Sequence, residues 1–273
     1  MQKILKCGSI YLMALKICSI ASSSKGNCIF VGSEKTRLLI DVGISFIRVK
    51  KSLLVLGEYD TQTPKPLNVL VTHTHRDHIS GIDLVVKNLG ATVYSYEKSR
   101  LGFRIKSPYK TFALQPFMVG DIQVQPIAAP HDTPCVGFKL KNGTSVISIL
   151  TDVGELSEPI IETLSESDIV FLESNHDIDM LRRGPYDISL KRRVLSSEGH
   201  LSNDTAAAAL EKIVARGRAK QIILGHLSEN NNTPELAERT VLKRLINSGA
   251  VQNKDFYLEV APAAGLSGLY SVE

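Results

Sequence analysis

Paired thiolates, long apolar runs and an excess of one charge are all missing from this sequence. The 273 residues include four cysteines with no C-x-x-C pair, so they do not resemble a thiolate zinc site; we expect buried neutral thiols in a reducing cytoplasm. No stretch reaches the about 18 uninterrupted apolar residues that a membrane-spanning helix requires. The 32 basic and 28 acidic side chains leave a net charge of +4, which permits an anionic partner without requiring one.

Internal repeats and low-complexity linkers are also absent, and no change in composition divides the chain. The hydrophobic fraction of 43% and the charged fraction of 22% are those of an ordinary globular protein. A domain of this size can bury roughly 75% of the surface that its unfolded chain exposes. We therefore expect one domain over residues 13–273, preceded by an N-terminal extension (1–12) of unclear role, with Met13 as an alternative start. Nothing in the sequence specifies an oligomeric state.

Two interpretations of the N-terminal region stay open. Basic residues precede a short apolar run over residues 7–15, and Ser19-Ile20-Ala21 resembles a signal-peptidase site. However, Lys16 interrupts the apolar run, and residues 15–31 also show the pattern of a strand, a Ser/Gly turn and a second strand. We favour the pair of strands.

Short apolar segments alternate with amphipathic ones along the rest of the chain. The expected strands cover residues 38–40, 68–72, 93–95, 122–127, 138–140, 145–150, 169–172, 221–224 and 255–260. The expected helices cover residues 46–54, 82–88, 159–164, 190–195 and 203–215, and one more begins at Thr233-Pro234. Asn142-Gly143 predicts a tight hairpin.

Histidine and aspartate gather directly after the apolar strand at 68–72. His73, His75, Asp77 and His78 lie within six residues, although the whole chain has seven histidines. In a regular strand His73 and His75 share a face, whereas Asp77 and His78, in the turn that follows, can face a second ion. The spacing favours two adjacent metals over a hydrophilic loop with chance histidines.

Residues 73–78 match the H-x-H-x-D-H signature of the metallo-β-lactamase-fold hydrolases, and later segments resemble further motifs of that family. This resemblance implies an α/β (α+β) fold, a four-layer αββα sandwich. It also implies two divalent metal ions per chain. The implied ligands are His73, His75 and His131 for the first ion and Asp77, His78 and His226 for the second, with Asp152 between the ions and Asp41 orienting the site from behind its ligands.

Four further segments, residues 22–28, 173–177, 199–203 and 229–237, look like the WalJ (YycJ) branch of this family. The match covers nearly the whole chain from Met13, and the branch is associated with 5′ to 3′ exonuclease activity on DNA. The resemblance thus implies a dinuclear-metal-dependent phosphodiesterase, a DNA exonuclease of the cytoplasm that uses a metal-bridging hydroxide. Zn²⁺ or Mn²⁺ would fill the site, with Fe²⁺ as a further candidate.

Asp77, Glu173 and His200 are the expected catalytic residues. By resemblance to the tRNA-processing zinc enzymes, His200 would stabilise developing charge or protonate the leaving oxygen, and Glu173 would orient its ring. A structural role for this pair is the alternative. His176 is expected near the site without an assigned role.

Positive charge gathers in residues 181–194 and could bind successive phosphates, although a solvated helix face is nearly as good an explanation. Tyr186, in the same segment, could stack on a base. Residues 22–27 could form a backbone nest for a phosphate or only a hairpin turn. The cations that we expect to bind substrate are Arg182, Arg183, Lys191, Arg192 and Arg193.

Three other functions compete with the nuclease. A small-molecule metallohydrolase acting on a thioester, a lactone or a cyclic phosphodiester is the main alternative. A regulatory module with a vestigial site is disfavoured, because all seven ligand positions are filled. An oxygen-reducing di-iron protein is disfavoured as well, because such relatives usually carry Glu where this chain has His75.

Overall fold

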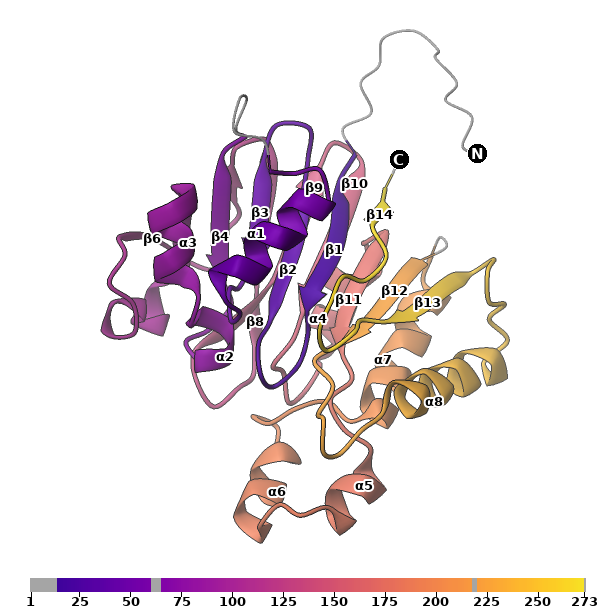
Figure 1. The fold of residues 1–273 in the computed structure, drawn as a ribbon. Helices are drawn as coiled ribbons and strands as arrows, with labels where there is room; N and C mark the ends of the chain where they lie inside the picture. Colours follow the sequence, from indigo (N-terminus) through magenta and orange to yellow (C-terminus); the bar gives the residue numbers. More distant parts are fainter. Residues whose placement is uncertain (1–13, 60–64, 218–219, 273) are drawn as a thin grey trace, which may run out of the picture.

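Two mixed β-sheets of seven strands each face one another in the computed structural model, which describes residues 14–59, 65–217 and 220–272 (Figure 1). The first sheet has the order β14-β1-β2-β3-β4-β5-β6. Its strands are β1 (Lys16–Ala21), β2 (Cys28–Gly32), β3 (Arg37–Ile40), β4 (Leu67–Val71), β5 (Thr92–Tyr96), β6 (Tyr109–Phe112) and β14 (Tyr270–Ser271).

The second sheet has the order β13-β12-β11-β10-β9-β8-β7. Its strands are β7 (Phe117–Val119), β8 (Ile122–Ala129), β9 (Cys135–Asn142), β10 (Ser145–Leu150), β11 (Ile169–Glu173), β12 (Lys220–Gly225) and β13 (Phe256–Val260). The strands β3 to β6 pair in parallel, and so do β10 to β13. Their carboxyl ends therefore share one edge within each sheet, which is where ligands bind in parallel sheets.

Helices cover the outer face of each sheet. The helices are α1 (Phe46–Val55), α2 (Arg76–Ile79), α3 (Ile82–Leu89), α4 (Glu158–Ser165), α5 (Ile178–Arg183), α6 (Ile188–Val194), α7 (Asn203–Ala215) and α8 (Pro234–Asn247), with short 3₁₀ turns η1 (Glu97–Ser99) and η2 (Leu101–Phe103). None of the helices in the described part of the chain has the length and apolar character needed to span a bilayer.

Three apolar cores separate the layers. The middle core lies between the sheets, and the outer two lie under α1 and α3 on one side and under α4, α7 and α8 on the other. Strand β3 shows how the sequence builds them: Leu38 and Ile40 enter the middle core, while Leu39 enters the core under α1. Each such buried side chain stabilises the fold by about 1.5–3 kcal/mol. The expected αββα sandwich is confirmed.

Most expected elements appear at or near their predicted positions. Helix α7 has the predicted bounds, the side chain of Thr233 caps α8, and Asn142 pairs with Ser145 across the predicted hairpin. Residues 15–31 form β1, a turn and β2, so Ser19-Ile20-Ala21 is part of the first sheet. Cys7 and the 1–12 extension lie outside the described residues, and the other cysteines, Cys18, Cys28 and Cys135, are buried and free as expected.

Two details of the histidine cluster differ from expectation. Strand β4 ends at Val71, so His73 and His75 lie in a loop and share no strand face. Asp77 and His78 lie on the single-turn helix α2, whereas we expected a turn. The sequence analysis also missed short elements, namely β6, β7, β14, α2 and α5.

Candidate metal centre

The predicted ligands lie at the carboxyl ends of strands in both sheets. His73 follows β4, His131 follows β8, Asp152 follows β10 and His226 follows β12. Strand β11 ends on Glu173 itself. The two sheets thus deliver their polar residues to one edge of the sandwich.

The backbone at this edge adopts conformations that L-residues avoid. The φ angles are 61° at Asp41, 56° at Asp152 and 56° at His226, and each residue lies one or two positions after a strand. A left-handed conformation costs a non-glycine residue roughly 1–2 kcal/mol. Such strain is typical of sites where side-chain direction matters more than stability.

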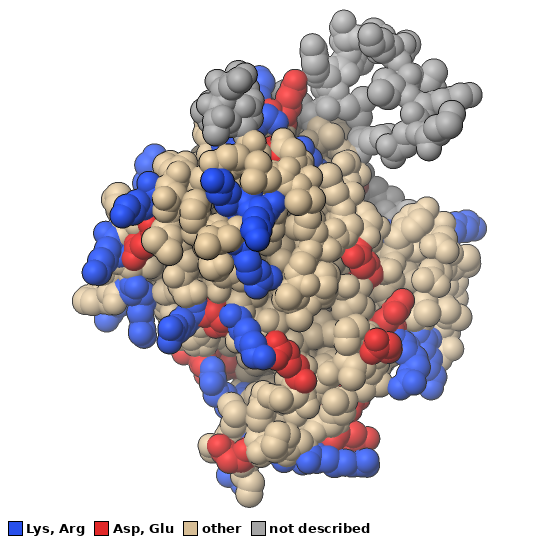
Figure 2. All heavy atoms as spheres, in the orientation of Figure 1, with Lys and Arg blue, Asp and Glu red and all other residues tan. Residues whose placement is uncertain are grey.

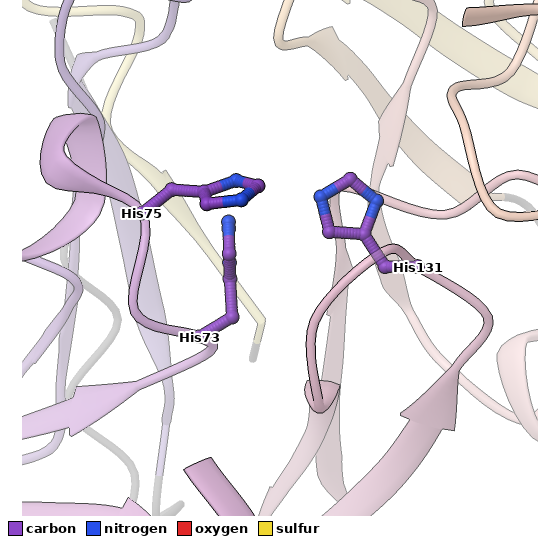
Figure 3. Close-up of side chains that lie close together, drawn as sticks. All are labelled: His73, His75 and His131. Atoms are coloured by element: carbon purple, nitrogen blue, oxygen red, sulfur yellow. The ribbon is translucent and has the colours of Figure 1, made fainter. Parts of the chain in front are cut away.

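The first group of donors comprises His73, His75 and His131, whose rings point toward one another (Figure 3). The centroid of the His73 ring lies 4.6 Å from that of His75 and 5.1 Å from that of His131. His73 and His131 are buried, whereas the His75 side chain is 32% exposed. The group therefore opens to solvent on the side of His75.

The second group comprises Asp77, His78 and His226. Oδ2 of Asp77 lies 3.3 Å from Nε2 of His78 and 4.0 Å from Nε2 of His226. A glycine brings the loop after β3 against this group, because a Cβ atom on Gly43 would lie 1.5 Å from the backbone oxygen of Asp77.

Asp152 lies between the two groups. Its Oδ1 atom is 4.0 Å from Nε2 of His73 and 3.9 Å from Nε2 of His131. The same carboxylate reaches the second group, with Oδ1 3.5 Å from Nε2 of His226 and Oδ2 3.4 Å from Nε2 of His78. One carboxylate therefore faces both sets of imidazoles.

These donors fit divalent cations. Ligand atoms bound 2.0–2.1 Å from a tetrahedral Zn²⁺ are about 3.4 Å apart, close to the separations around Asp152. Among the described residues, Oδ2 of Asp152 and Nε2 of His73, His131 and His226 have no hydrogen-bond partner although they are buried. An unpaired buried polar atom costs about 1–3 kcal/mol. Cations at this edge would satisfy all four atoms.

Charge and burial set the protonation of the donors. Burial lowers the pKa of the His73 and His75 imidazoles, which keeps them in the neutral form that binds metals. Burial alone would lower the pKa of His226 too, but the charge of Asp152 outweighs it and raises that pKa to about 10, so a cation bound here would displace this proton. Burial raises the pKa of the Asp152 carboxyl, but the charges of His226 and His78 hold it well below its usual range. Asp152 is therefore ionised.

Asp41 fixes the orientation of His78. Its Oδ2 atom lies 2.7 Å from Nδ1 of His78, so the Nδ1–H group donates to the carboxylate and Nε2 faces the site. The backbone N–H and the hydroxyl of Thr72 donate to the same carboxylate, each at 2.8 Å. The structure thus places Asp41 behind His78, and its role in orienting a metal ligand stays a prediction.

Glu173 is buried and contacts two histidines. Its Oε1 atom lies 2.7 Å from Nδ1 of His200 and 2.8 Å from Nδ1 of His226. The backbone N–H groups of Val153 and Leu201 donate to Oε2. Burial would raise the pKa of Glu173, but the charge of His200 and the hydrogen bonds from His200 and His226 lower it to about 2. The expected pairing with His200 is present, and the contact with His226 was not foreseen.

Two residues at the site were missed by the sequence analysis. Oδ1 of Asp132 lies 3.2 Å from Nε2 of His75 and 3.3 Å from Nε2 of His131, and its Oδ2 pairs with Arg193. Nδ2 of Asn27 lies 3.0 Å from Nε2 of His78. Adjacency to His131 was an available signal for Asp132, and Asn27 lies in a segment that the resemblance had already singled out.

The turn at residues 22–27 packs against the site. Asn27 closes this turn by accepting from the N–H of Ser23 and donating to its carbonyl, and the Ser22 hydroxyl accepts from the N–H of His226.

His176 is also buried at this edge of the sandwich, and burial lowers its pKa to about 4. It belongs to none of the donor groups found among the described residues.

The predicted substrate cations lie on α5 and α6, at the bottom of the view in Figure 1. Arg193 reaches the metal centre through its ion pair with Asp132. Lys191 is instead tied to α5, because its ammonium donates to the carbonyl of Arg182 at 2.8 Å. The remaining members, Arg182, Arg183 and Arg192, are exposed. Tyr186 accepts a bond from Asn230 at 3.3 Å.

Comparisons with known proteins show similarity over most of the chain. A family model described as β-lactamase superfamily domain matches residues 36–227. The chain is 33% identical over 256 residues to the exodeoxyribonuclease WalJ of Streptococcus pneumoniae serotype 2, covering 89% of this chain and 93% of the relative. It is 33% identical over 245 residues to the exodeoxyribonuclease YycJ of Bacillus anthracis, covering 87% and 91%.

Among solved structures, the metallo-β-lactamase fold protein YhfI of Bacillus subtilis superposes with a TM-score of 0.68. The alignment covers 93% of this chain and 99% of that one at 16% identity. At that identity the match shows a shared fold.

Proposed function

The chain belongs to the β-lactamase superfamily, and from that premise we propose that it is a two-metal phosphodiesterase that removes nucleotides from the 5′ end of DNA. The observation that carries the proposal is the position of Asp152 between two facing groups of imidazoles. The relatives named exodeoxyribonucleases, at 33% identity over most of the chain, support DNA as the substrate. A cytoplasmic location follows from such a substrate and suits the buried free thiols.

The donor groups divide between two ions. We assign the first ion to the three histidines that converge in Figure 3 and the second to Asp77, His78 and His226, with Asp152 shared. Two such ions, when bound, lower the pKa of a water towards 7 and clamp the attacking and leaving oxygens of a phosphodiester. Zn²⁺, Mn²⁺ and Fe²⁺ all suit these ligands.

His200, oriented by Glu173, supplies the proton. Because Nδ1 of His200 donates to Glu173, its Nε2 atom is left for the substrate. The His200 ring lies 5.3 Å from that of His131 and 5.4 Å from that of His226, between the two groups of donors. Its side chain is 17% exposed, so it reaches the open side of the site. We assign it the proton transfer to the leaving oxygen.

The cations of α5 and α6 hold the phosphates of the DNA strand. Arg193 stands at the edge of the first donor group, where its ion pair with Asp132 fixes the guanidinium. Arg182, Arg183, Lys191 and Arg192 extend the positive charge away from that edge. Phosphate contacts of this kind position a nucleic acid without reading its sequence.

The experiment that tests this function uses DNA labelled at either terminus and protein loaded with Zn²⁺ or Mn²⁺. Immediate release of a labelled mononucleotide from 5′-labelled strands, with progressive shortening of 3′-labelled strands, is the expected result. Asp77→Ala is the matched control and should leave both substrates intact. Intact DNA in the presence of the wild type, together with hydrolysis of a thioester or lactone, would replace the nuclease with a small-molecule hydrolase.

A further inference from the structure

Two adjacent hollows lie next to the loops of the metal centre, on a surface to which no function has yet been assigned. One has a volume of about 450 Å³, and Lys98, Arg100, Phe103 and Arg104 line it. The other has a volume of about 360 Å³ and shares Thr74 and Arg104 with the first. Thr74 lies between His73 and His75 in the chain, so the hollows begin beside the first donor group. We call the two together the 74–104 groove.

The groove is strongly basic. Arg76, Lys98, Arg100 and Arg104 all line it and are exposed. Asp83 is the one acid among the described lining residues, and bonds from the backbone N–H groups of residues 106 and 107 already engage its carboxylate. None of the four cations forms an ion pair with a carboxylate of the described residues, unlike Arg193, which pairs with Asp132. The positive charge is therefore available to an anion.

The aromatic ring of Phe103 lies among these cations. Phe103 is 86% exposed, a larger fraction than for any other large apolar side chain that the structure describes. Its neighbours Leu101 and Ile105 are buried, so the segment is anchored on both sides of the ring. Arg100 reaches this position with φ at 52°, in the left-handed region.

Hydrogen bonds fix the segment at residues 98–104 that lines the groove. The Ser99 hydroxyl donates to the carbonyl of Pro134 at 3.2 Å, which ties η1 to the loop that carries His131. The N–H of Gly102 donates to the hydroxyl of Tyr109 at 3.1 Å, and the N–H of Arg104 donates to the carbonyl of Leu101 at 2.8 Å. Phe103 is therefore exposed on a fixed turn and not on a loose one.

The groove lies apart from the cations of α5 and α6. In Figure 1, α2 lies between α3 and β6 at the left and α6 at the bottom. Figure 2 shows Lys and Arg side chains gathered along the left edge, over the part of the chain that holds α3 and β6, and again at the bottom. Both basic regions border the loop at 131–134, α6 through Asp132 and the groove through Thr133 and Pro134.

We propose that the 74–104 groove binds an unpaired stretch of the DNA strand, with Arg100 and Arg104 on its phosphates and Phe103 stacked on a base. Cations interleaved with an exposed aromatic ring are the elements that bind single strands without sequence preference. A base in a duplex is stacked on its neighbours and leaves no face for the ring. The proposal rests on the proposed nuclease function and adds that the strand is unpaired where it leaves the metal centre.

Fluorescence of a 2-aminopurine oligonucleotide tests the stacking directly. The protein carries Asp77→Ala so that the strand stays whole, and the reporter base is moved along a single strand of about 12 nucleotides. The expected result is quenching at one position, lost in Phe103→Ala and kept in Phe103→Tyr. Binding by Phe103→Ala should be about 5- to 150-fold weaker, the range for one lost base–aromatic stack. Val55→Ala, which shortens another exposed apolar residue, is the matched control.

The salt dependence of binding tests the cations. Arg100→Gln with Arg104→Gln should reduce the slope of log affinity against log salt by about 1.4, from about 0.7 for each lost single-strand phosphate contact. Lys243→Gln, an exposed charge on α8, should leave the slope unchanged. Unchanged quenching and an unchanged slope in these variants would overturn the proposal.

A small substrate separates this proposal from the function on which it depends. Bis(p-nitrophenyl) phosphate needs the metal centre but has no nucleobase and no second phosphate for the groove to bind, so the groove variants, built on the wild-type site, should hydrolyse it at the wild-type rate. Groove variants that bind and cut DNA like the wild type would end the groove proposal alone. A wild type that neither binds the oligonucleotide nor cuts DNA would end the nuclease function as well.

Discussion

Oε1 of Glu173 lies 2.7 Å from Nδ1 of His200 in the floor of the site. The same oxygen lies 2.8 Å from Nδ1 of His226, which we assign to the second ion. A single buried carboxylate thus orients both a metal ligand and the residue that we assign to proton transfer. Glu173 thus positions both histidines, although we assign metal binding to His226 and proton transfer to His200.

Substitutions at this pair should separate metal content from rate. His200→Ala should keep both ions and lose about 10²- to 10⁴-fold in rate, because a general acid contributes roughly that factor. Glu173→Ala should lose rate and also bind metal about 10- to 100-fold more weakly, because His226 loses its support. Metal analysis beside turnover of each variant checks both. If His200→Ala released metal, His200 would itself be a ligand.

Asp41 should act through metal affinity. In Asp41→Ala the His78 ring loses the acceptor of its Nδ1–H group, so we expect about 10- to 100-fold weaker binding of the metal. Competition with a chelator of known affinity measures this directly. An unchanged affinity would show that Thr72 and the backbone hold the site without Asp41.

The cations of α5 and α6 should govern the response of DNA binding to salt. Arg192→Gln with Arg193→Gln should weaken binding and reduce the salt slope by about 0.7 to 0.9 for each phosphate contact that is lost. Lys191→Gln should have less effect, because its ammonium is bonded to the carbonyl of Arg182. Titrations at several salt concentrations give the slopes. Equal slopes for all variants would show that these residues do not bind phosphates and only form a solvated helix face.

Asp121 should stabilise the fold without affecting the site. Its carboxylate accepts from the hydroxyls of Ser33 and Thr36, at 2.7 and 2.6 Å, and from Nδ2 of Asn142 at 2.8 Å. These bonds join the turns β2–β3 and β7–β8, one from each sheet, at the edge opposite the metal centre. Asp121→Ala should lower the free energy of unfolding by about 1–2 kcal/mol, with metal content and rate unchanged.

The loss of unfolding free energy in Asp121→Ala should depend on pH. Burial would raise the pKa of Asp121, but the bonds from Thr36 and Ser33 outweigh it and hold the pKa below its ordinary value of 3.8. A carboxyl with a lowered pKa stabilises the fold above the ordinary value, and this stabilisation is lost as the pH falls through the lowered one. Urea unfolding should therefore show wild type and variant converging below about pH 4. A constant difference down to pH 2 would refute this.

Part of the candidate site could be placed from the sequence, because the H-x-H-x-D-H segment follows an apolar strand and the resemblance implied the later ligands. The structure has His73 and His226 just after strands β4 and β12, and their role as ligands stays a prediction. The left-handed conformations of Asp152 and His226 could not be placed from the sequence, because they depend on packing between strands far apart in the chain. The simultaneous contacts of Glu173 with His200 and His226 could not be predicted for the same reason.

Short elements escaped the sequence analysis for a different reason. Helix α2 has four residues and β7 has three, too few for a periodic pattern. Asp132 looked like a neighbour of a ligand, and only the approach of Arg193 on α6, 61 residues further along the chain, shows that Asp132 joins this arginine to the first donor group. Contacts between residues so far apart in the chain leave no signal in the local sequence.

Anomalous diffraction from crystals grown with Zn²⁺ or Mn²⁺ tests the dinuclear centre most directly. The account predicts two peaks about 3.5 to 4 Å apart. One should lie at Nε2 of His73 and His131, the other at His78 and His226, and the carboxylate of Asp152 should lie between them. A single peak elsewhere, or none at the strand ends, would contradict the claim that this edge of the sandwich binds two metal ions.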